Sequence, residues 1–171
     1  GLSVNLITTL LPFRPLNDTT TWMFIADDSV MRKDNATTVR IWGIVAPAVK
    51  PPVALGSGGL TGNYTAVYTY ARKVGTSIAH ESNPSPTSNQ LVASASQIVI
   101  NATAPTDGQV THIRYYRTVA GGAIRLFELE QAVAQVTNGY THSWESDNIS
   151  GTDEAQFTKA TSESGLVCCF Q

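Results

Sequence analysis

Strict alternation of side-chain types from residue 64 to residue 71 is the feature that most constrains the fold of this chain. Tyr64, Tyr68 and Tyr70 lie on one side of the alternation, and threonine, valine or alanine fills the positions between them. A period of two places successive side chains on opposite faces of a strand, whereas a helix repeats about every 3.6 residues. Aromatic and β-branched residues also favour strands. The segment therefore predicts a strand.

Further short apolar or alternating runs follow after residue 60, and turn-forming residues separate them. These runs are 97–101, 110–118, 124–129 and 140–144. Pro84 and Pro86, in the turn-rich stretch 81–88, exclude a central strand there and favour an extended crossing at an edge. Five to seven short strands with turns about every 8–15 residues are what a two-sheet sandwich needs. We therefore predict an all-β chain with an immunoglobulin-like β-sandwich.

Residues 128–136 form the one segment with helix-like composition. Glutamate, glutamine and alanine favour a helix there, but the segment is short and contains two valines. Both assignments stay open at this point, and a strand followed by a loop is favoured.

Composition divides the chain into four parts. Residues 1–46 contain short apolar runs between Asp, Asn and Ser turns, which predicts a small strand-rich segment arranged as an antiparallel meander. Residues 47–59 are rich in proline and glycine and predict a linker, stiff in its first half and flexible in its second. Residues 60–149 form the predicted sandwich. Residues 150–171 form a polar tail that ends in a short apolar patch, Leu166–Phe170.

The charge of the chain is low and evenly distributed. Only 14% of the residues are charged, and the formal net charge is -2. No run of lysine or arginine supplies the electrostatic footprint that nucleic acid or an anionic membrane would need as a partner. The longest apolar stretches, such as Val4–Leu11 and Ile41–Val49, are too short and too interrupted to span a bilayer. We therefore expect neither nucleic-acid partners nor a membrane span.

The two cysteines, Cys168 and Cys169, are adjacent near the carboxyl end of the sequence. Neighbouring cysteines rarely pair, because the small ring is strained. Two unpaired thiols are the favoured interpretation, and a vicinal or intermolecular disulfide is the alternative.

A search for catalytic chemistry yields no catalytic, metal-binding or cofactor-binding residue. His80, His112 and His142 lie far apart without metal-ligand spacing, so we expect them to be packed or at the surface. Glu128 and Glu130 lie two residues apart on one face of a strand. They could act as a glycosidase pair, but a solvent-facing strand surface is the commoner cause of such spacing. We therefore predict that the chain is not an enzyme and needs no cofactor.

Two loops invite a ligand interpretation that their details disfavour. The glycine cluster 56–62 lacks a following Lys-Ser/Thr pair and leads into a strand pattern, so it does not match a phosphate-binding loop. The acidic stretch 145–154 offers carboxylates for Ca²⁺, but it lacks the alternating oxygen ligands of a helix-loop-helix site. A solvated loop is the favoured interpretation of the second stretch.

Surface chemistry leaves two further questions open. Glycosylation sequons, which would be surface sites in a host that glycosylates its secreted proteins, begin at Asn17, Asn35, Asn63, Asn101 and Asn148. The aromatic residues that either stack on carbohydrate or pack across a sheet are Tyr64, Tyr68, Tyr70, Tyr115, Tyr116 and Trp144. Packing across a sheet is favoured for the aromatics, because strand tyrosines more often bury the ring and leave the hydroxyl at the rim.

Two phrases carry a family resemblance. Residues 60–70 contain Gly-x-Tyr-x-x-x-Tyr-Thr-Tyr, and 81–86 read Glu-Ser-Asn-Pro-Ser-Pro. Residues 109–118 contain Arg-Tyr-Tyr-Arg-Thr, and a glycine turn follows at 120–122. These phrases resemble the strands, corner and hairpin of fibronectin type III-like modules in phage and other virion proteins.

The resemblance extends over residues 22–149, because the segment around Trp22–Asp27 and Trp42–Ile44 is similar to segments that precede such modules in long tail-associated proteins. It implies a fibronectin III/immunoglobulin-like sandwich and a structural role in a virion, and the family motif contains no catalytic site. Fold analogy alone does not fix function.

The expected function is therefore that of a non-enzymatic virion structural protein, a tail or capsid-surface component located on the virion or outside the cell. Its expected partners are other virion proteins or copies of itself, joined through exposed strand edges and through apolar patches such as Val4–Leu11 and Leu166–Phe170. The alternative is a secreted adhesin or carbohydrate-binding module that uses the aromatic residues on a host-surface glycan. The third hypothesis is that the chain is a fragment of a glycan-degrading enzyme.

Overall fold

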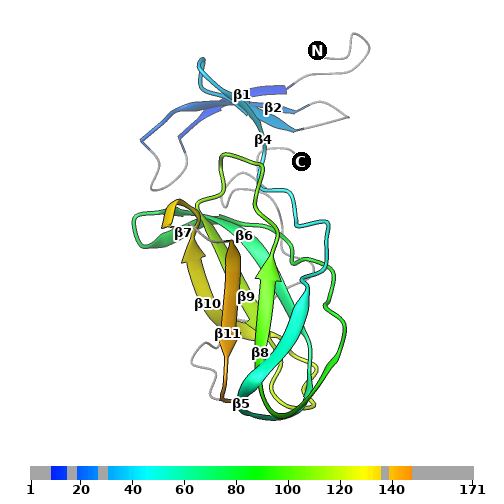
Figure 1. The fold of residues 1–171 in the computed structure, drawn as a ribbon. Coiled ribbons are helices and arrows are strands. Elements are labelled where there is room, and N and C mark those ends of the chain that lie inside the picture. The colour runs from blue at the N-terminus through cyan, green and yellow to red at the C-terminus, as the bar shows by residue number, and fades with distance from the viewer. Residues whose placement is uncertain (1–8, 15–18, 27–30, 136–138, 148–171) are drawn as a thin grey trace.

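The computed structural model describes residues 9–14, 19–26, 31–135 and 139–147 (Figure 1). The regular structure of these residues consists of strands and one short 3₁₀ turn, Val133–Gln135, so the all-β prediction is confirmed. No helix within these ranges has the length and apolarity that a membrane crossing requires.

The amino-terminal part forms a four-stranded antiparallel sheet, in which each strand pairs with the next (Figure 1). Its strands are β1 (Thr9–Phe13), β2 (Trp22–Ala26), β3 (Arg32–Asp34) and β4 (Val39–Ile41). Trp22 and Phe24 are buried on one face of this sheet, where Leu11, Phe13 and Trp42 pack against them. The predicted meander is therefore present.

The remaining strands form two facing sheets, one of four strands in the order β10-β9-β6-β7 and one of three in the order β11-β8-β5. The strands are β5 (Val53–Tyr64), β6 (Ala66–Val74), β7 (Ser77–Glu81), β8 (Leu91–Ala102), β9 (His112–Arg117), β10 (Leu126–Ala132) and β11 (Tyr140–Trp144). All pairings within both sheets are antiparallel. The chain passes from one sheet to the other at Thr65, between β5 and β6.

One hydrophobic core lies between these two sheets and takes side chains from both. The four-stranded sheet contributes Tyr68 and Ile113, and the three-stranded sheet contributes Ile98, Ile100 and Trp144, all of them buried. This shared core is the arrangement of a β-sandwich. The tyrosines of the predicted alternation lie in it, whereas their neighbours on β6 point to the opposite face of the sheet.

The first half of β6 pairs with β9 on one side, and on its other side three serines take the place of a strand partner. The amides of Ser82, Ser85 and Ser88 donate to the carbonyls of Tyr70, Tyr68 and Ala66, each at 2.9 Å. In return, the β6 amides of these three residues donate to the serine hydroxyl oxygens at 3.0–3.2 Å. We call this set of contacts the serine ladder.

The serine ladder explains how a proline-containing segment can close a sheet edge. Each serine hydroxyl also donates to the carbonyl of the next residue, so its hydrogen-bonding capacity is used in both directions. Pro84 and Pro86 lie between the serines, at positions from which no amide donor is needed. The predicted extended crossing at an edge is confirmed, and hydroxyl oxygens accept the bonds that backbone carbonyls accept in an ordinary strand pair.

The flexible-linker prediction for Gly56–Gly59 is wrong. These residues belong to β5, which begins at Val53 and pairs with β8 through two irregularities in register, between Ser57 and Leu60 and between Leu60 and Gly62. A Cβ atom on Gly58 would lie 2.5 Å from the backbone nitrogen of Gln97. The glycine therefore permits a close approach between two backbones at a bulge, which is a common role of glycine within a strand.

The favoured assignment of residues 128–136 is confirmed for the described part of the segment. β10 runs to Ala132 and the 3₁₀ turn follows it. Tertiary pairing with β9 overrides the helix propensity of the glutamates and alanines.

Replacing Ser85 by alanine tests the serine ladder. The change leaves the buried Tyr68 amide without an acceptor, which lowers the free energy of unfolding by roughly 1–3 kcal/mol. Urea unfolding measures the effect. Ser77→Ala, at an exposed serine of β7, is the matched control and changes stability by less than about 0.5 kcal/mol. Equal effects of the two changes would contradict the ladder.

Replacing Gly58 by alanine tests the close approach of β5 to β8. The added methyl group meets the Gln97 backbone, so we expect a loss of about 1–3 kcal/mol in urea unfolding. Gly108→Ala is the control, because a Cβ atom there meets nothing within 4 Å. It should leave stability unchanged or raise it by up to about 1 kcal/mol. A Gly58→Ala protein as stable as wild type would restore the linker interpretation.

Candidate interaction surfaces

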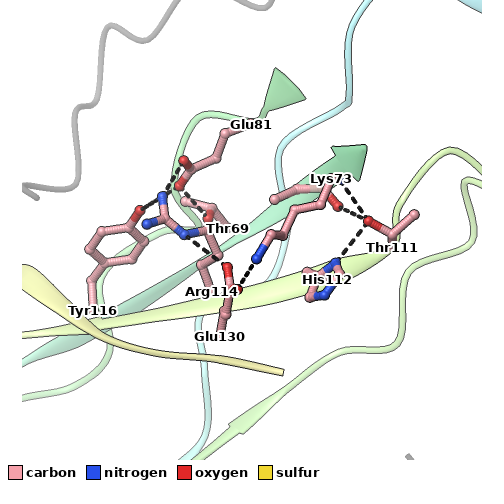
Figure 2. A network of polar contacts seen from close by, with 9 residues as sticks. Thr69, Lys73, Glu81, Thr111, His112, Arg114, Tyr116 and Glu130 are labelled. Atoms are coloured by element: carbon pink, nitrogen blue, oxygen red, sulfur yellow. Dashed lines mark hydrogen bonds and ion pairs between the residues drawn. The ribbon is translucent and has the colours of Figure 1, made fainter. Parts of the chain in front are cut away.

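The four-stranded sheet of the sandwich carries a buried polar network on the face that points away from the core (Figure 2). Glu81, at the end of β7, accepts a hydrogen bond from Arg114 Nη1 at 2.5 Å through Oε2. Its other oxygen, Oε1, accepts from Tyr116 Oη at 2.5 Å and from Thr69 Oγ1 at 2.7 Å. Both partners of the Glu81–Arg114 ion pair are almost fully buried.

Neighbouring groups extend this network along the sheet. The Arg114 guanidinium lies 4.4 Å from the ring centre of Phe127, a cation–π distance. Lys73 forms an ion pair with Glu130, and Glu130 also lies 3.9 Å from Arg114 Nε (Figure 2). The charges of the two cations and two carboxylates cancel, and Lys73, Arg114 and Glu130 line a depression of about 460 Å³.

This arrangement suits a structural role better than a chemical one. A buried ion pair adds little net stability, because the desolvation of the two charges offsets their attraction. Removing one partner is nevertheless costly, because the other charge is then left buried and unpaired. The Glu81 carboxylate at the end of β7 is held by three donors from two other strands, Thr69 on β6 and Arg114 and Tyr116 on β9. The network therefore fixes the register of β6, β7 and β9 relative to one another.

The two predicted carboxylates, Glu128 and Glu130, belong to separate ion-pair groups. A bulge between Phe127 and Leu129 interrupts the alternation that the one-face prediction assumes. Glu130 joins Lys73, whereas Glu128 accepts a 2.7 Å hydrogen bond from Arg117 Nε. The expected pairing of the two carboxylates on one regular strand face is therefore wrong.

The environment of Glu128 shifts its titration. Burial by itself raises the pKa of this carboxyl, but contacts with His142 and Arg117 outweigh burial and hold the pKa below its ordinary value. His142 Nε2 lies 3.8 Å away, which is an electrostatic contact and too long for a hydrogen bond. Arg117 is therefore the principal partner.

The histidines occupy packed positions on three different strands. His80 is buried in β7, and His112 is half-buried in β9, where burial lowers its pKa. His142 in β11 stacks on Trp144, with ring centres 5.9 Å apart. Across the described ranges, no three His, Cys, Asp or Glu side chains are grouped so that they could hold a metal ion.

The aromatic residues are packed and do not form a carbohydrate-stacking surface: five of them lie in the core between the sheets, and Tyr116 packs with Val67 and Phe127 in a separate cluster. The six aromatics considered for stacking are each at most 9% exposed. Tyr68 and Tyr70 bury their rings and donate from the rim to the carbonyls of Val49 and Thr103. Burial raises the pKa of Tyr64 to about 12, and its hydroxyl donates to Asp147. The packing alternative is therefore confirmed, and the glycan alternative loses the residues on which it was based.

The sequons and the acidic stretch are only partly described. Asn63 is exposed, whereas the Asn35 side chain accepts hydrogen bonds within a turn and that of Asn101 accepts one from Thr141. In the acidic stretch, Glu145 accepts from Gln97, and Asp147 contacts Tyr64 and Arg117. Predicted features outside the described residues are Asn17, Asn148, the rest of the acidic stretch, most of Val4–Leu11, Leu166–Phe170, Cys168 and Cys169.

Strand β5 is an edge strand whose backbone groups can be assigned to two sides. The Asn101 amide donates to the Pro52 carbonyl at 3.0 Å. Because facing pairs in an antiparallel ladder alternate, residues 54 and 56 direct their amides and carbonyls to β8. The backbone groups of Val53, Leu55 and Ser57 therefore point outward, and among the described residues β5 pairs only with β8.

This edge differs from the other three edges of the sandwich. β5 has twelve residues and none of them is charged. β10 carries Glu128 at a bulge together with Glu130, β7 ends in Glu81, and both β7 and β11 have only five residues. Charges, bulges and shortness are the usual means by which proteins prevent pairing at a sheet edge. Residues 53–57 of β5 carry no charge and come before the two register irregularities of this strand.

Comparison with protein-family models, curated proteins and solved structures finds no match for this chain. The fibronectin type III-like assignment therefore stays a prediction.

Replacing Glu128 by glutamine tests the ion pair with Arg117. At neutral pH the variant should be less stable by roughly 1–3 kcal/mol, because a charge-assisted hydrogen bond is lost. A carboxyl whose pKa is lowered by folding stabilises the protein above its unfolded pKa, and this contribution disappears as the pH falls through the folded value.

Urea unfolding between about pH 7 and pH 3 should therefore show the stabilities of wild type and Glu128→Gln converging at acid pH. Glu145→Gln, at an exposed carboxylate, is the control and should run parallel to wild type. A stability difference that stays constant down to acid pH would contradict a lowered pKa for Glu128.

Proposed function

We propose that this chain is a non-enzymatic structural module of a virion, a tail or capsid-surface component that assembles by strand addition. The observation that carries the proposal is the open, uncharged edge of β5. Strand addition joins an extended segment of another protein to such an edge through main-chain hydrogen bonds. The outward backbone groups of Val53, Leu55 and Ser57 supply the donors and acceptors for this pairing.

The side chains around this edge favour a protein partner. Leu55 is 45% exposed, and Ala54 and Ser57 are exposed beside it. An incoming strand would cover Leu55 while meeting no charge along residues 53–57. Its main-chain groups would pair with β5, and the small side chains would leave room for its own side chains.

The charged and titratable groups of the sandwich support a structural role. Glu81, Arg114, Lys73 and Glu130 cross-link strands within one sheet, and Glu128 is engaged by Arg117. Groups held in this way contribute to the rigidity of the scaffold. A rigid sandwich with one pairing edge is suited to repeated assembly.

The resemblance to fibronectin type III-like modules supports the virion setting. Its first phrase falls on β5 and β6, and its Glu-Ser-Asn-Pro-Ser-Pro corner supplies two serines of the serine ladder. The phrases therefore coincide with residues that build the sandwich. The extracellular location belongs to the same proposal.

Electron cryo-microscopy of particles from a culture that produces this chain tests the proposal, combined with mass spectrometry of gradient-purified particles. We expect the chain in ordered copies on the tail or capsid surface, with a strand of a neighbouring protein beside residues 53–57. Recovery of the chain only in the particle-free fraction would contradict the virion role. Ordered copies with nothing beside β5 would contradict strand addition alone.

Replacing Leu55 by proline tests the edge itself. Proline removes the outward amide and leaves the β5–β8 ladder intact, so the variant should fold and yet fail to enter particles. Leu55→Ala keeps the amide and should be incorporated.

Ala54→Pro is the matched control, because it removes an inward ladder bond at the neighbouring position and should lower stability by roughly 3 kcal/mol. Urea unfolding and the variant content of purified particles are the two measurements. Normal incorporation of a folded Leu55→Pro protein would contradict docking at this edge.

A further inference from the structure

The amino-terminal sheet has a second apolar face in addition to the one that holds its core. Cross-strand partners in an antiparallel sheet point to the same side, so the register assigns each side chain to a face. The face opposite Trp22 and Phe24 presents Leu10, Pro12, Met23, Ile25, Arg32, Asp34, Val39 and Ile41. We call this set the outer face.

The outer face is exposed to solvent. Leu10 is 57% exposed, Val39 58% and Met23 38%. Ile25, on the inner strand β2, and Ile41, on the edge strand β4, are half-buried. A sheet usually buries one face and turns a polar face to water, so apolar side chains on three of the four strands of the other face point to an interaction surface.

The two charges of the outer face lie on the same short strand. Arg32 and Asp34 are two residues apart on β3, with Lys33 between them pointing to the opposite face. The other outer-face residues, on β1, β2 and β4, are uncharged. The outer face therefore has no net charge and carries one cation and one anion in line along a strand.

We propose that the outer face binds the outer face of a second copy of this chain, with the two β3 strands antiparallel. A two-fold axis perpendicular to these strands then brings Arg32 of each copy opposite Asp34 of the other. The same symmetry places Met23, Ile25, Val39 and Ile41 of both copies between the sheets. An interface made by one patch with itself is the arrangement that two-fold dimers require.

The charge pattern selects this orientation over its alternative. If the two β3 strands ran parallel, Arg32 would face Arg32 and Asp34 would face Asp34. Like charges in opposition suppress a wrong pairing, and complementary charges fix the register of a correct one. The pattern on β3 is complementary to itself only when the strands are antiparallel.

The expected association is weak. Four strands about 4.8 Å apart and three to five residues long cover roughly 200–300 Å² on each copy. Stable complexes bury more than this, so we expect a dissociation constant of about 10–1,000 µM. This surface lies on a different sheet from β5, and either interaction can hold without the other.

Sedimentation velocity of the full chain, from about 10 µM to 1 mM, tests the proposal over this affinity range. Wild type should shift from monomer to dimer. Val39→Lys, at an exposed position, should reduce association at least about tenfold, because two cations then enter the apolar part of the interface. Leu55→Pro changes only the β5 edge and should dimerise like wild type.

Charge reversal tests the orientation. Arg32→Asp alone and Asp34→Arg alone should each be monomeric, because each copy then presents two like charges. An equimolar mixture of the two variants should form a heterodimer, and Arg32→Asp with Asp34→Arg in one chain should restore the homodimer. A merely structural effect of either variant would not be rescued by mixing.

Three results would overturn the proposal. One is a wild-type chain that stays monomeric up to about 1 mM, the upper end of the dissociation constants expected for an interface of this size. The second is a dimer that Val39→Lys leaves intact, which would place the interface elsewhere. The third is a failure of folded charge variants to rescue one another. If circular dichroism shows that the charge variants do not fold, the sedimentation of wild type and of Val39→Lys over the same concentrations decides whether the outer face forms the dimer.

Discussion

The serine ladder is the interaction on which the rest of the sandwich depends. β6 carries Tyr68 and Tyr70 into the core and holds one partner of the polar network on its other face, so its position fixes both layers. Its first half would be an open edge, because β7 pairs only with residues 71–74. Ser82, Ser85 and Ser88 close that edge with amides and hydroxyls. This leaves buried polar groups satisfied where a proline-containing segment crosses.

The closed edge of β6 contrasts with the open edge of β5. The sandwich closes β6 with serines, interrupts β10 with a bulge at Glu128, and keeps β7 and β11 short. Residues 53–57 of β5 are regular, uncharged and paired on one side among the described residues. The outer face of the amino-terminal sheet is likewise apolar without a described cover. The two surfaces proposed for assembly are therefore an uncharged stretch of strand edge and an exposed, mostly apolar sheet face.

The sequence predicts the parts of this structure that are periodic or local. The tyrosine alternation gives β6 and its core face, and Pro84 and Pro86 give the extended crossing. The serines of the serine ladder recur at every third residue. This spacing is the period of neither a strand nor a helix, so the sequence pattern does not predict the ladder. Gly58 looks like a linker residue because its role depends on the backbone of Gln97, which only tertiary pairing brings close. The Glu81–Arg114 pair joins residues 33 positions apart and depends on a register that no local pattern encodes.

Amide hydrogen exchange of the monomeric protein under native conditions tests the central claim most directly. The amides of Ala66, Tyr68 and Tyr70 face the serines, so we expect them to exchange only with global unfolding. The amides of Val53, Leu55 and Ser57 face solvent and should exchange near the rate of an unstructured chain. Fast exchange at the three β6 amides, or strong protection at the three β5 amides, would contradict the assignment of the closed and open edges.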